Sequence, residues 1–193
     1  MVQLTGVKKI KCAVFISGTG SNLKSLIQFT NKKKSPILIE LIISDNPNAK
    51  GLKFGKIFNI SKKVFNYKNK TSAEKKIISE LKNKNINLIC LAGFMKILSK
   101  DFIKNFKGKI LNIHPSLLPK YKGLNTHQRA ISNSEKYSGC TVHIVNSRLD
   151  SGKIILQKKV KISKSDTAKS LAKKVLIQEH KLYPKALRKI FSL

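Results

Sequence analysis

Short runs of apolar residues alternate with amphipathic stretches along the first part of this 193-residue chain, which is the pattern of an α/β domain. Uninterrupted apolar runs predict buried strands, and apolar residues three or four positions apart predict the helices that cover them. Strands are predicted at 10–17, 37–44, 63–67, 86–92 and 109–114. Helices are predicted at 21–32, 49–58, 71–81 and 98–106, the third beginning with a Thr71–Glu74 capping box.

The pattern changes after Pro115. A long loop containing Pro and Gly covers 115–126, and a helix follows at 126–134. Strands at 138–146 and 153–162 flank a turn and are expected to pair antiparallel, and a last helix covers 167–190. No repeat or linker interrupts the sequence. The expected fold class is therefore α/β, a single doubly wound, mostly parallel sheet flanked by helices, with an antiparallel C-terminal hairpin.

The composition is that of a globular protein in a reducing compartment. Hydrophobic residues make up 41% of the chain and charged residues 25%, which provides a core and excludes a disordered chain. No window approaches the roughly 20 uncharged apolar residues of a membrane span, and no secretory signal precedes the N-terminal lysines. The three cysteines, Cys12, Cys90 and Cys140, lie far apart among strand-like residues. We therefore expect free thiols and a cytoplasmic protein.

The charge is extreme but carries little information about function. Lys and Arg number 40 against nine Asp and Glu, a net charge of +31 that would suit nucleic acid. Only Arg129, Arg148 and Arg188 are arginines, and the lysines are spread along the whole chain with abundant Asn and Ile. Because all three abundant residues have A/T-rich codons, genome composition explains this loading at least as well as polyanion binding. We expect any binding of nucleic acid to be non-specific.

A glycine-containing loop between the first strand and the first helix is a candidate phosphate site. In Ser17-Gly18-Thr19-Gly20-Ser21-Asn22 the glycines would let backbone N–H groups approach a phosphate at the positive end of a helix. The third glycine of a dinucleotide fingerprint is replaced by Leu23, and the lysine of a P-loop is missing. The loop therefore suits a monophosphate, and the alternative is an ordinary tight turn.

Three polar residues could carry catalysis. Asn112 and His114 are two apart on a predicted strand and therefore share a face at its carboxyl end, where α/β sheets bind ligands. An amide and an imidazole there could bind an oxyanion and transfer a proton, or His114 could simply cap the loop. Asp150 could orient and charge an imidazole, or it could bond to its own turn. Sequence spacing alone does not bring Asp150 to His114.

Other candidate residues are less specific. The apolar turn at 91–98 could form the wall of a site for a flat heteroaromatic ligand, although core packing is the commoner role of such residues. His143 has the pattern of a packed strand residue, and His127 and His180 have no partner pattern. No spacing of His, Cys and carboxylates resembles a metal site, and no metal is expected.

Four segments together give the chain a resemblance to the folate-dependent glycinamide ribonucleotide formyltransferases of purine biosynthesis. They are Ile16–Leu23, Leu91–Leu98, Leu111–Tyr121 and Gln178–His180, and the resemblance runs from about Lys11 to the end. It implies a Rossmann-like formyltransferase domain at 11–193 behind an N-terminal extension at 1–10. It also implies formyl transfer from 10-formyltetrahydrofolate to the amine of 5-phosphoribosylglycinamide without a covalent intermediate. The sequence leaves open whether the protein is a monomer or a homodimer.

The resemblance also implies roles for individual residues. Catalysis falls to Asn112, His114 and Asp150. The substrate-binding residues are Thr19, Gly20, Ser21, Asn22 and Glu179. The folate-site residues are Lys70, Met95, Lys96, Ile97, Leu98 and Asn112. Lys70 stands where the family has an arginine, and the exchange loses bidentate geometry.

Two other readings compete with this one. Methionyl-tRNA formyltransferase and formyltetrahydrofolate hydrolase have similar catalytic domains, but we expect neither a tRNA-binding domain after this one nor a regulatory domain before it. A non-catalytic phosphate- or RNA-binding module is a third reading. Added salt should abolish binding by dispersed lysines, whereas binding in a pocket should survive it.

Overall fold

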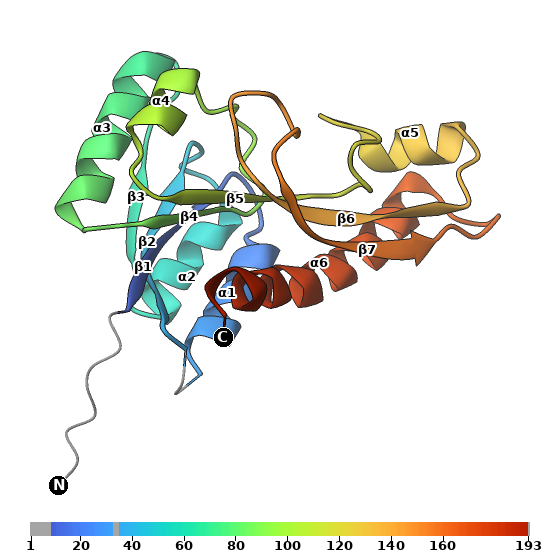
Figure 1. Cartoon of the computed structure of the whole chain (residues 1–193), viewed down its shortest axis with the longest axis horizontal. Helices are drawn as coiled ribbons and strands as arrows, with labels where there is room; N and C mark the ends of the chain where they lie inside the picture. The colour runs from blue at the N-terminus through green and yellow to red at the C-terminus, as the bar shows by residue number, and fades with distance from the viewer. Residues whose placement is uncertain (1–8, 33–34, 193) are drawn as a thin grey trace, which may run out of the picture.

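The computed structural model describes residues 9–32 and 35–192, and within them one seven-stranded sheet forms the centre of the molecule (Figure 1). The spatial order is β3-β2-β1-β4-β5-β6-β7. Neighbours from β3 to β5 run parallel, whereas β6 is antiparallel to both β5 and β7. The predicted fold class is confirmed. The strands are β1 (Ile10–Ile16), β2 (Ile37–Ser44), β3 (Ser61–Val64), β4 (Leu88–Leu91), β5 (Lys109–His114), β6 (Tyr137–Ile144) and β7 (Ile154–Lys161).

Helices cover both faces of the sheet. Because side chains alternate along a strand, Val14 of β1 packs with α1 and α6 on one face, and its neighbour Phe15 packs with α3 and α4 on the other. Figure 1 shows α3 and α4 together on one side of the molecule and α6 along β6 and β7. The helices are α1 (Ser21–Thr30), the 3-10 turn η1 (Lys50–Leu52), α2 (Lys53–Ile57), α3 (Lys70–Asn83), α4 (Lys100–Asn105), α5 (Thr126–Ser132) and α6 (Ala168–Phe191).

Two local predictions were wrong. The start of α3 is capped by Asn69, whose side chain accepts a bond from the Ser72 N–H, and the predicted capping box at Thr71 and Glu74 does not form. Glu74 instead lies buried and accepts hydrogen bonds from the backbone and hydroxyl of Ser99, because its face of α3 meets the beginning of α4. The third strand is shifted from 63–67 to Ser61–Val64, an exposed edge strand without the apolar pattern of its neighbours.

The long helix α6 continues through Pro184. Proline has no N–H to donate to the carbonyl four residues earlier, that of His180. The Ser25 hydroxyl on α1 donates to that carbonyl instead, at 2.7 Å. One residue before the proline, the fully buried Tyr183 hydroxyl lies 3.2 Å from the Leu91 carbonyl and 3.1 Å from that of Leu111. The tyrosine thereby joins α6 to the last residue of β4 and to the middle of β5.

The sheet has a topological switch point between β1 and β4, since the chain moves outward from this pair in both directions. Loops that leave adjacent parallel strands there splay apart and leave a crevice for ligands. Of the predicted N-terminal extension, residues 1–8 lie outside the described residues, and Ile10 already begins β1. None of the described helices is both long enough and apolar enough to cross a bilayer.

Candidate functional site

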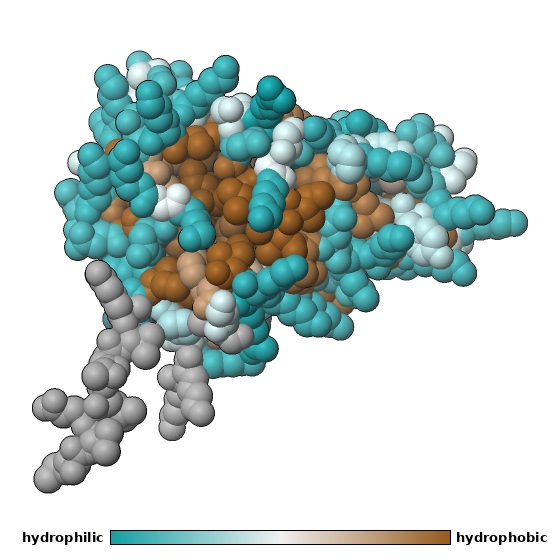
Figure 2. All heavy atoms as spheres, in the orientation of Figure 1, coloured by the Kyte–Doolittle hydropathy of each residue, from teal (hydrophilic) through white to brown (hydrophobic). Residues whose placement is uncertain are grey.

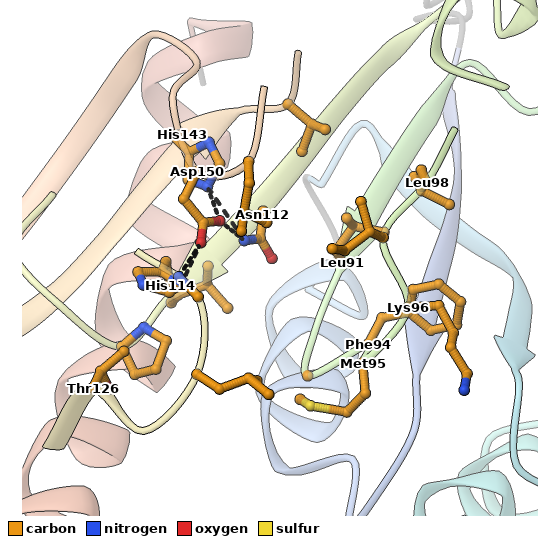
Figure 3. Close-up of a pocket in the computed structure, with 18 of the residues that line it drawn as sticks. Leu91, Phe94, Met95, Lys96, Leu98, Asn112, His114, Thr126, His143 and Asp150 are labelled. Carbon is orange, nitrogen blue, oxygen red and sulfur yellow. Dashed lines mark hydrogen bonds and ion pairs between the residues drawn. The ribbon is translucent and has the colours of Figure 1, made fainter. Parts of the chain in front are cut away.

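A cavity of about 520 Å³ lies at the carboxyl ends of β4 and β5, next to the switch point. One wall is polar and comes from β5, β6 and the loop before β7, and the facing wall is the apolar turn after β4 (Figure 3). The cavity-lining residues that the sequence predicted are Asn22, Met95, Lys96, Ile97, Leu98, Asn112, His114, Asp150 and Glu179.

The amide, imidazole and carboxylate predicted from the sequence do meet. Asn112 and His114 share the face of β5 that opens into the cavity, and Asp150 reaches them from the loop between β6 and β7. An Asp150 Oδ2 atom lies 3.4 Å from Nδ1 of His114, and Oδ1 lies 3.5 Å from Nδ2 of Asn112. Both members of the His114–Asp150 pair have 8% exposed side chains, so solvent screens their attraction little.

The two ring nitrogens of His114 have different partners. Nε2 lies 2.8 Å from the carbonyl oxygen of Tyr121, which can only accept, so Nε2 carries a proton in either charge state. Nδ1 faces the carboxylate of Asp150 at the longer distance of 3.4 Å. When the ring is protonated, its Nδ1–H is the more loosely held of the two and the better placed to be given up.

Asp150 is held as an anion. Burial by itself raises the pKa of its carboxyl, but a bond from His143, the Gly123 N–H and the nearby imidazoles outweigh it and lower the pKa below the ordinary value. The Gly123 N–H lies 2.9 Å from Oδ2. The carboxylate thus bonds to the loop before α5, and the alternative of an aspartate that merely closes its own turn is wrong. The carboxylate therefore presents a negative charge to Nδ1 of His114.

His143 belongs to the same cluster, although sequence reasoning treated it as a packed strand residue. It is opposite Asn112 in the β5–β6 pairing. Its Nδ1 lies 3.0 Å from the Ile144 carbonyl, and its Nε2 lies 3.2 Å from the Asn112 amide nitrogen and 3.6 Å from Oδ1 of Asp150. The signal that could have identified it is the spacing of Thr141 and His143, which repeats that of Asn112 and His114 on the neighbouring strand.

Thr141 is a second residue that the sequence did not single out. It is opposite His114 in the same pairing and fully buried. Its hydroxyl donates to the Ser116 carbonyl at 2.6 Å and accepts from the Leu118 N–H at 3.1 Å. These bonds fix the start of the loop that follows His114.

The candidate phosphate loop leads into helix α1, whose N-terminus has no side-chain cap. Gly20 is the N-cap of α1 with φ +73°, and no side chain caps the first turn. A Cβ at Gly20 would lie 2.7 Å from the Cα of Gly51, so only glycine fits. Gly18 and Thr19 are exposed, and the first turn leaves backbone N–H groups available to an anion. Of the predicted loop residues, Asn22 lines the cavity, and Thr19, Gly20 and Ser21 lie just outside its lining.

Asn22 of α1 and Glu179 of α6 join these two helices at the lining of the cavity. The Asn22 amide donates to the Glu179 carboxylate at 2.6 Å, and both residues are buried. Burial raises the pKa of Glu179, and the bond from Asn22 offsets part of that rise. The Oδ1 atom of Asn22 is buried without a partner. The pair is therefore a polar site that a ligand with hydroxyl or amine donors would complete.

Aromatic packing in the core holds the apolar turn after β4 in place. Phe94 packs edge-on against Phe15, with ring centroids 5.3 Å apart, and against Tyr67 at 5.7 Å. Beyond this anchor Met95 and Ile97 are each 62% exposed at the cavity, an apolar surface suited to a flat ring system.

Two lysines were predicted for the folate site. The Lys96 ammonium points away from the polar wall (Figure 3) and lies 3.8 Å from Asp45, so only the rest of the residue lines the cavity. Lys70 is exposed at the start of α3 and does not line the cavity.

The remaining chemistry predictions concern metals, thiols and charge. Among the described residues no group of three or more His, Cys, Asp or Glu could hold a metal ion. The three cysteines are buried and free, as predicted. On the face drawn in Figure 2, hydrophilic residues lie all around the outline and surround an apolar area.

Comparison with known proteins shows that residues 10–187 match the family described as "Formyl transferase". Phosphoribosylglycinamide formyltransferase of Haemophilus influenzae is 42% identical over 181 residues, 92% of this chain and 85% of that protein. The human trifunctional purine biosynthetic protein adenosine-3 is 43% identical over 188 residues, which are 96% of this chain and only 19% of that protein. The crystal structure of phosphoribosylglycinamide formyltransferase from Brucella melitensis is 42% identical, with a TM-score of 0.89 over 95% of this chain and 96% of that chain.

Proposed function

This chain belongs to the formyl transferase family, and we propose that it transfers a formyl group from 10-formyltetrahydrofolate to the amine of 5-phosphoribosylglycinamide, a step of purine biosynthesis. The observation that carries the proposal is the meeting of Asn112, His114 and Asp150 in one cavity that also reaches Asn22, the last residue of the candidate phosphate loop. Three buried free cysteines suit a reducing compartment such as the cytoplasm.

The cavity suits the two substrates at different ends. The loop at 17–22 would take the phosphate of the ribonucleotide through backbone N–H groups, with Thr19, Gly20, Ser21 and Asn22 nearest to it. Glu179 would accept hydrogen bonds from the same substrate. The turn at 93–98 would hold the folate ring system between apolar side chains, and the folate supplies the activated formyl group.

The residues then divide the chemistry between them. As the amine attacks the formyl carbon, negative charge grows on the formyl oxygen. Of the two Asn112 N–H groups, one bonds to His143 at 3.2 Å and the other makes only a 3.5 Å contact with Asp150, so the second is free to donate to that oxygen. The new C–N bond forms first and gives a tetrahedral intermediate, and the bond to the folate nitrogen then breaks as the carbonyl re-forms.

His114 and Asp150 complete the transfer. Protonated His114 adds positive charge near the developing oxyanion and gives its Nδ1 proton to the departing folate nitrogen. Its Nε2–H stays on the Tyr121 carbonyl and keeps the ring in place. The attacking amine loses one proton, which returns to the vacated Nδ1 of His114 beside Asp150, so the net change is one proton moved from the amine to the folate nitrogen.

The test is an acceptor comparison with purified protein. Formyl transfer from 10-formyltetrahydrofolate should occur with 5-phosphoribosylglycinamide and be at least about tenfold slower with glycinamide riboside, which lacks the phosphate, since one charge-assisted anion contact is worth about 1.5–3 kcal/mol. Faster formylation of initiator methionyl-tRNA, or hydrolysis alone, would replace this proposal by one of the related reactions. Binding of RNA that survives high salt with no formyl transfer would indicate a binding module instead.

A further inference from the structure

The loop that holds both catalytic partners is itself held by contacts with α5 and the residues after it. The loop after β5 contributes the Tyr121 carbonyl to His114 and the Gly123 N–H to Asp150, at 2.8 and 2.9 Å. Tyr121 adopts φ +55°, a left-handed conformation that a tyrosine does not favour on its own. External contacts must therefore stabilise this segment.

Glu135 and Asn133 bond to the Tyr121 hydroxyl, and Arg129 of α5 contacts the backbone and the ring. Its Nη1 atom donates to the Lys122 carbonyl at 2.7 Å and lies 3.4 Å from that of Leu124. Its guanidinium also lies over the ring of Tyr121, with Cζ 5.2 Å from the centroid. Among the described residues Arg129 takes part in no ion pair, so its charge is directed at these carbonyls and this ring.

The bond to Lys122 has a particular consequence. The Lys122 carbonyl and the Gly123 N–H are the two ends of one peptide group. A cation on the oxygen draws electron density from the nitrogen and makes its N–H a stronger donor, because hydrogen bonds in a chain polarise one another. Arg129 therefore strengthens the bond between Gly123 and Asp150 through a single peptide group, although it is exposed and touches neither catalytic partner.

We propose that Arg129 is a positioning residue for the reaction proposed above: through the 122–123 peptide group and the Tyr121 ring it fixes Asp150 and His114 before substrate binds. Lysine cannot replace it fully, since an ammonium lacks the planar group that stacks on a ring while donating in its own plane. In a chain with three arginines among 40 basic residues, this is a position where the guanidinium has a specific role.

The test compares Arg129→Ala and Arg129→Lys with Arg188→Ala, a control at an exposed arginine over Phe29 in the groove between α1 and α6, outside the catalytic cavity. For Arg129→Ala we expect kcat about tenfold lower with both KM values within about twofold, since the loss of one hydrogen bond to a charged group is worth about 1.5 kcal/mol. Arg129→Lys should recover part of the loss, and Arg188→Ala should equal wild type.

An activity-independent measurement separates this proposal from the proposed function. In NMR spectra of the substrate-free protein, the Gly123 amide proton should move upfield and exchange faster with solvent in Arg129→Ala and not in Arg188→Ala. An unmoved Gly123 signal, or an unchanged kcat, would overturn the role of Arg129. If wild-type protein does not formylate 5-phosphoribosylglycinamide but the Gly123 signal moves as expected in Arg129→Ala, the positioning role of Arg129 is supported and the proposed function is wrong.

Discussion

Asp150→Asn removes one charge from the cluster while keeping the shape of the side chain. In the wild type, Oδ2 accepts from the Gly123 N–H at 2.9 Å and faces His114, and Oδ1 faces Asn112 and His143 at 3.5 and 3.6 Å. An asparagine offers one oxygen and one NH₂, so either orientation places a donor against a donor. The change therefore disrupts at least one side of the cluster as well as the charge.

The expected loss follows from the geometry. Two unit charges 3.4 Å apart attract by about 5 kcal/mol at an effective dielectric constant of about 20, the upper limit for the His114 contribution. A hydrogen bond to a charged group contributes about 1.5–3 kcal/mol, the lower limit if only the Gly123 bond is lost. Because each 1.36 kcal/mol is a factor of ten in rate, these limits correspond to a fall in kcat of between about tenfold and about 10^3.7-fold.

The assay is steady-state formyl transfer, accompanied by thermal unfolding to show that the variant is folded. Asp166→Asn is the matched control, because Asp166 also pairs with a cation, Lys174 at 2.7 Å, but lies before α6 and outside the cavity. The control should keep wild-type kcat. An Asp150→Asn enzyme within about threefold of wild type would refute the reasoning about charge in this cluster.

Three further predictions address other parts of the account. His114→Ala should lower kcat by about 10² to 10⁴, the range for a lost acid–base group, with smaller effects on both KM values; steady-state kinetics near wild type would remove His114 from its role. Glu179→Gln should weaken binding of 5-phosphoribosylglycinamide about tenfold or more and yet raise Tm at neutral pH, since an amide is cheaper to bury than a carboxylate. Because burial raises the pKa of Glu179 above 4.5, wild-type stability should fall as pH rises from about 4.5 through the folded pKa. The Tm advantage of Glu179→Gln should grow over the same pH range and then stay constant. Melting curves from pH 4 to 8 that show the same advantage at every pH would contradict this. Tyr183→Phe should destabilise the fold by about 1–3 kcal/mol, a Tm loss of roughly 2–12 °C, because it removes the donor shared by the Leu91 and Leu111 carbonyls without opening a cavity. Calorimetry showing an unchanged Tm would mean that those carbonyls need no such donor.

Local patterns predicted most of the fold. The strands β2 and β5 have the predicted bounds, because most of their residues are apolar, as expected of strands covered on both faces, and the segments beside them are polar or contain proline. The capping box failed for a different reason. Thr71 and Glu74 have the right spacing, but α4 places two donors of Ser99 beside Glu74, and a contact between distant residues outweighed the local one.

The site residues likewise include some that local patterns predict and some that depend on contacts between distant segments. The placement of Asn112 and His114 on one face follows from strand periodicity, which needs no knowledge of the fold. Asp150 and His143 join them only through the antiparallel register of β5 with β6 and the turn that follows, neither of which residue types encode locally. The contacts of Tyr121 and Gly123 are backbone atoms, and backbone donors and acceptors leave no mark in a sequence.

The central claim is that one cavity transfers a formyl group between its two substrates without holding it covalently. A rapid-quench experiment with ¹³C-formyl-labelled 10-formyltetrahydrofolate and 5-phosphoribosylglycinamide tests it directly. The account predicts that the label appears on the glycinamide nitrogen as fast as it leaves the folate, and that no label remains on denatured protein. Label lost from the folate as free formate, or bound to the protein, would contradict the account.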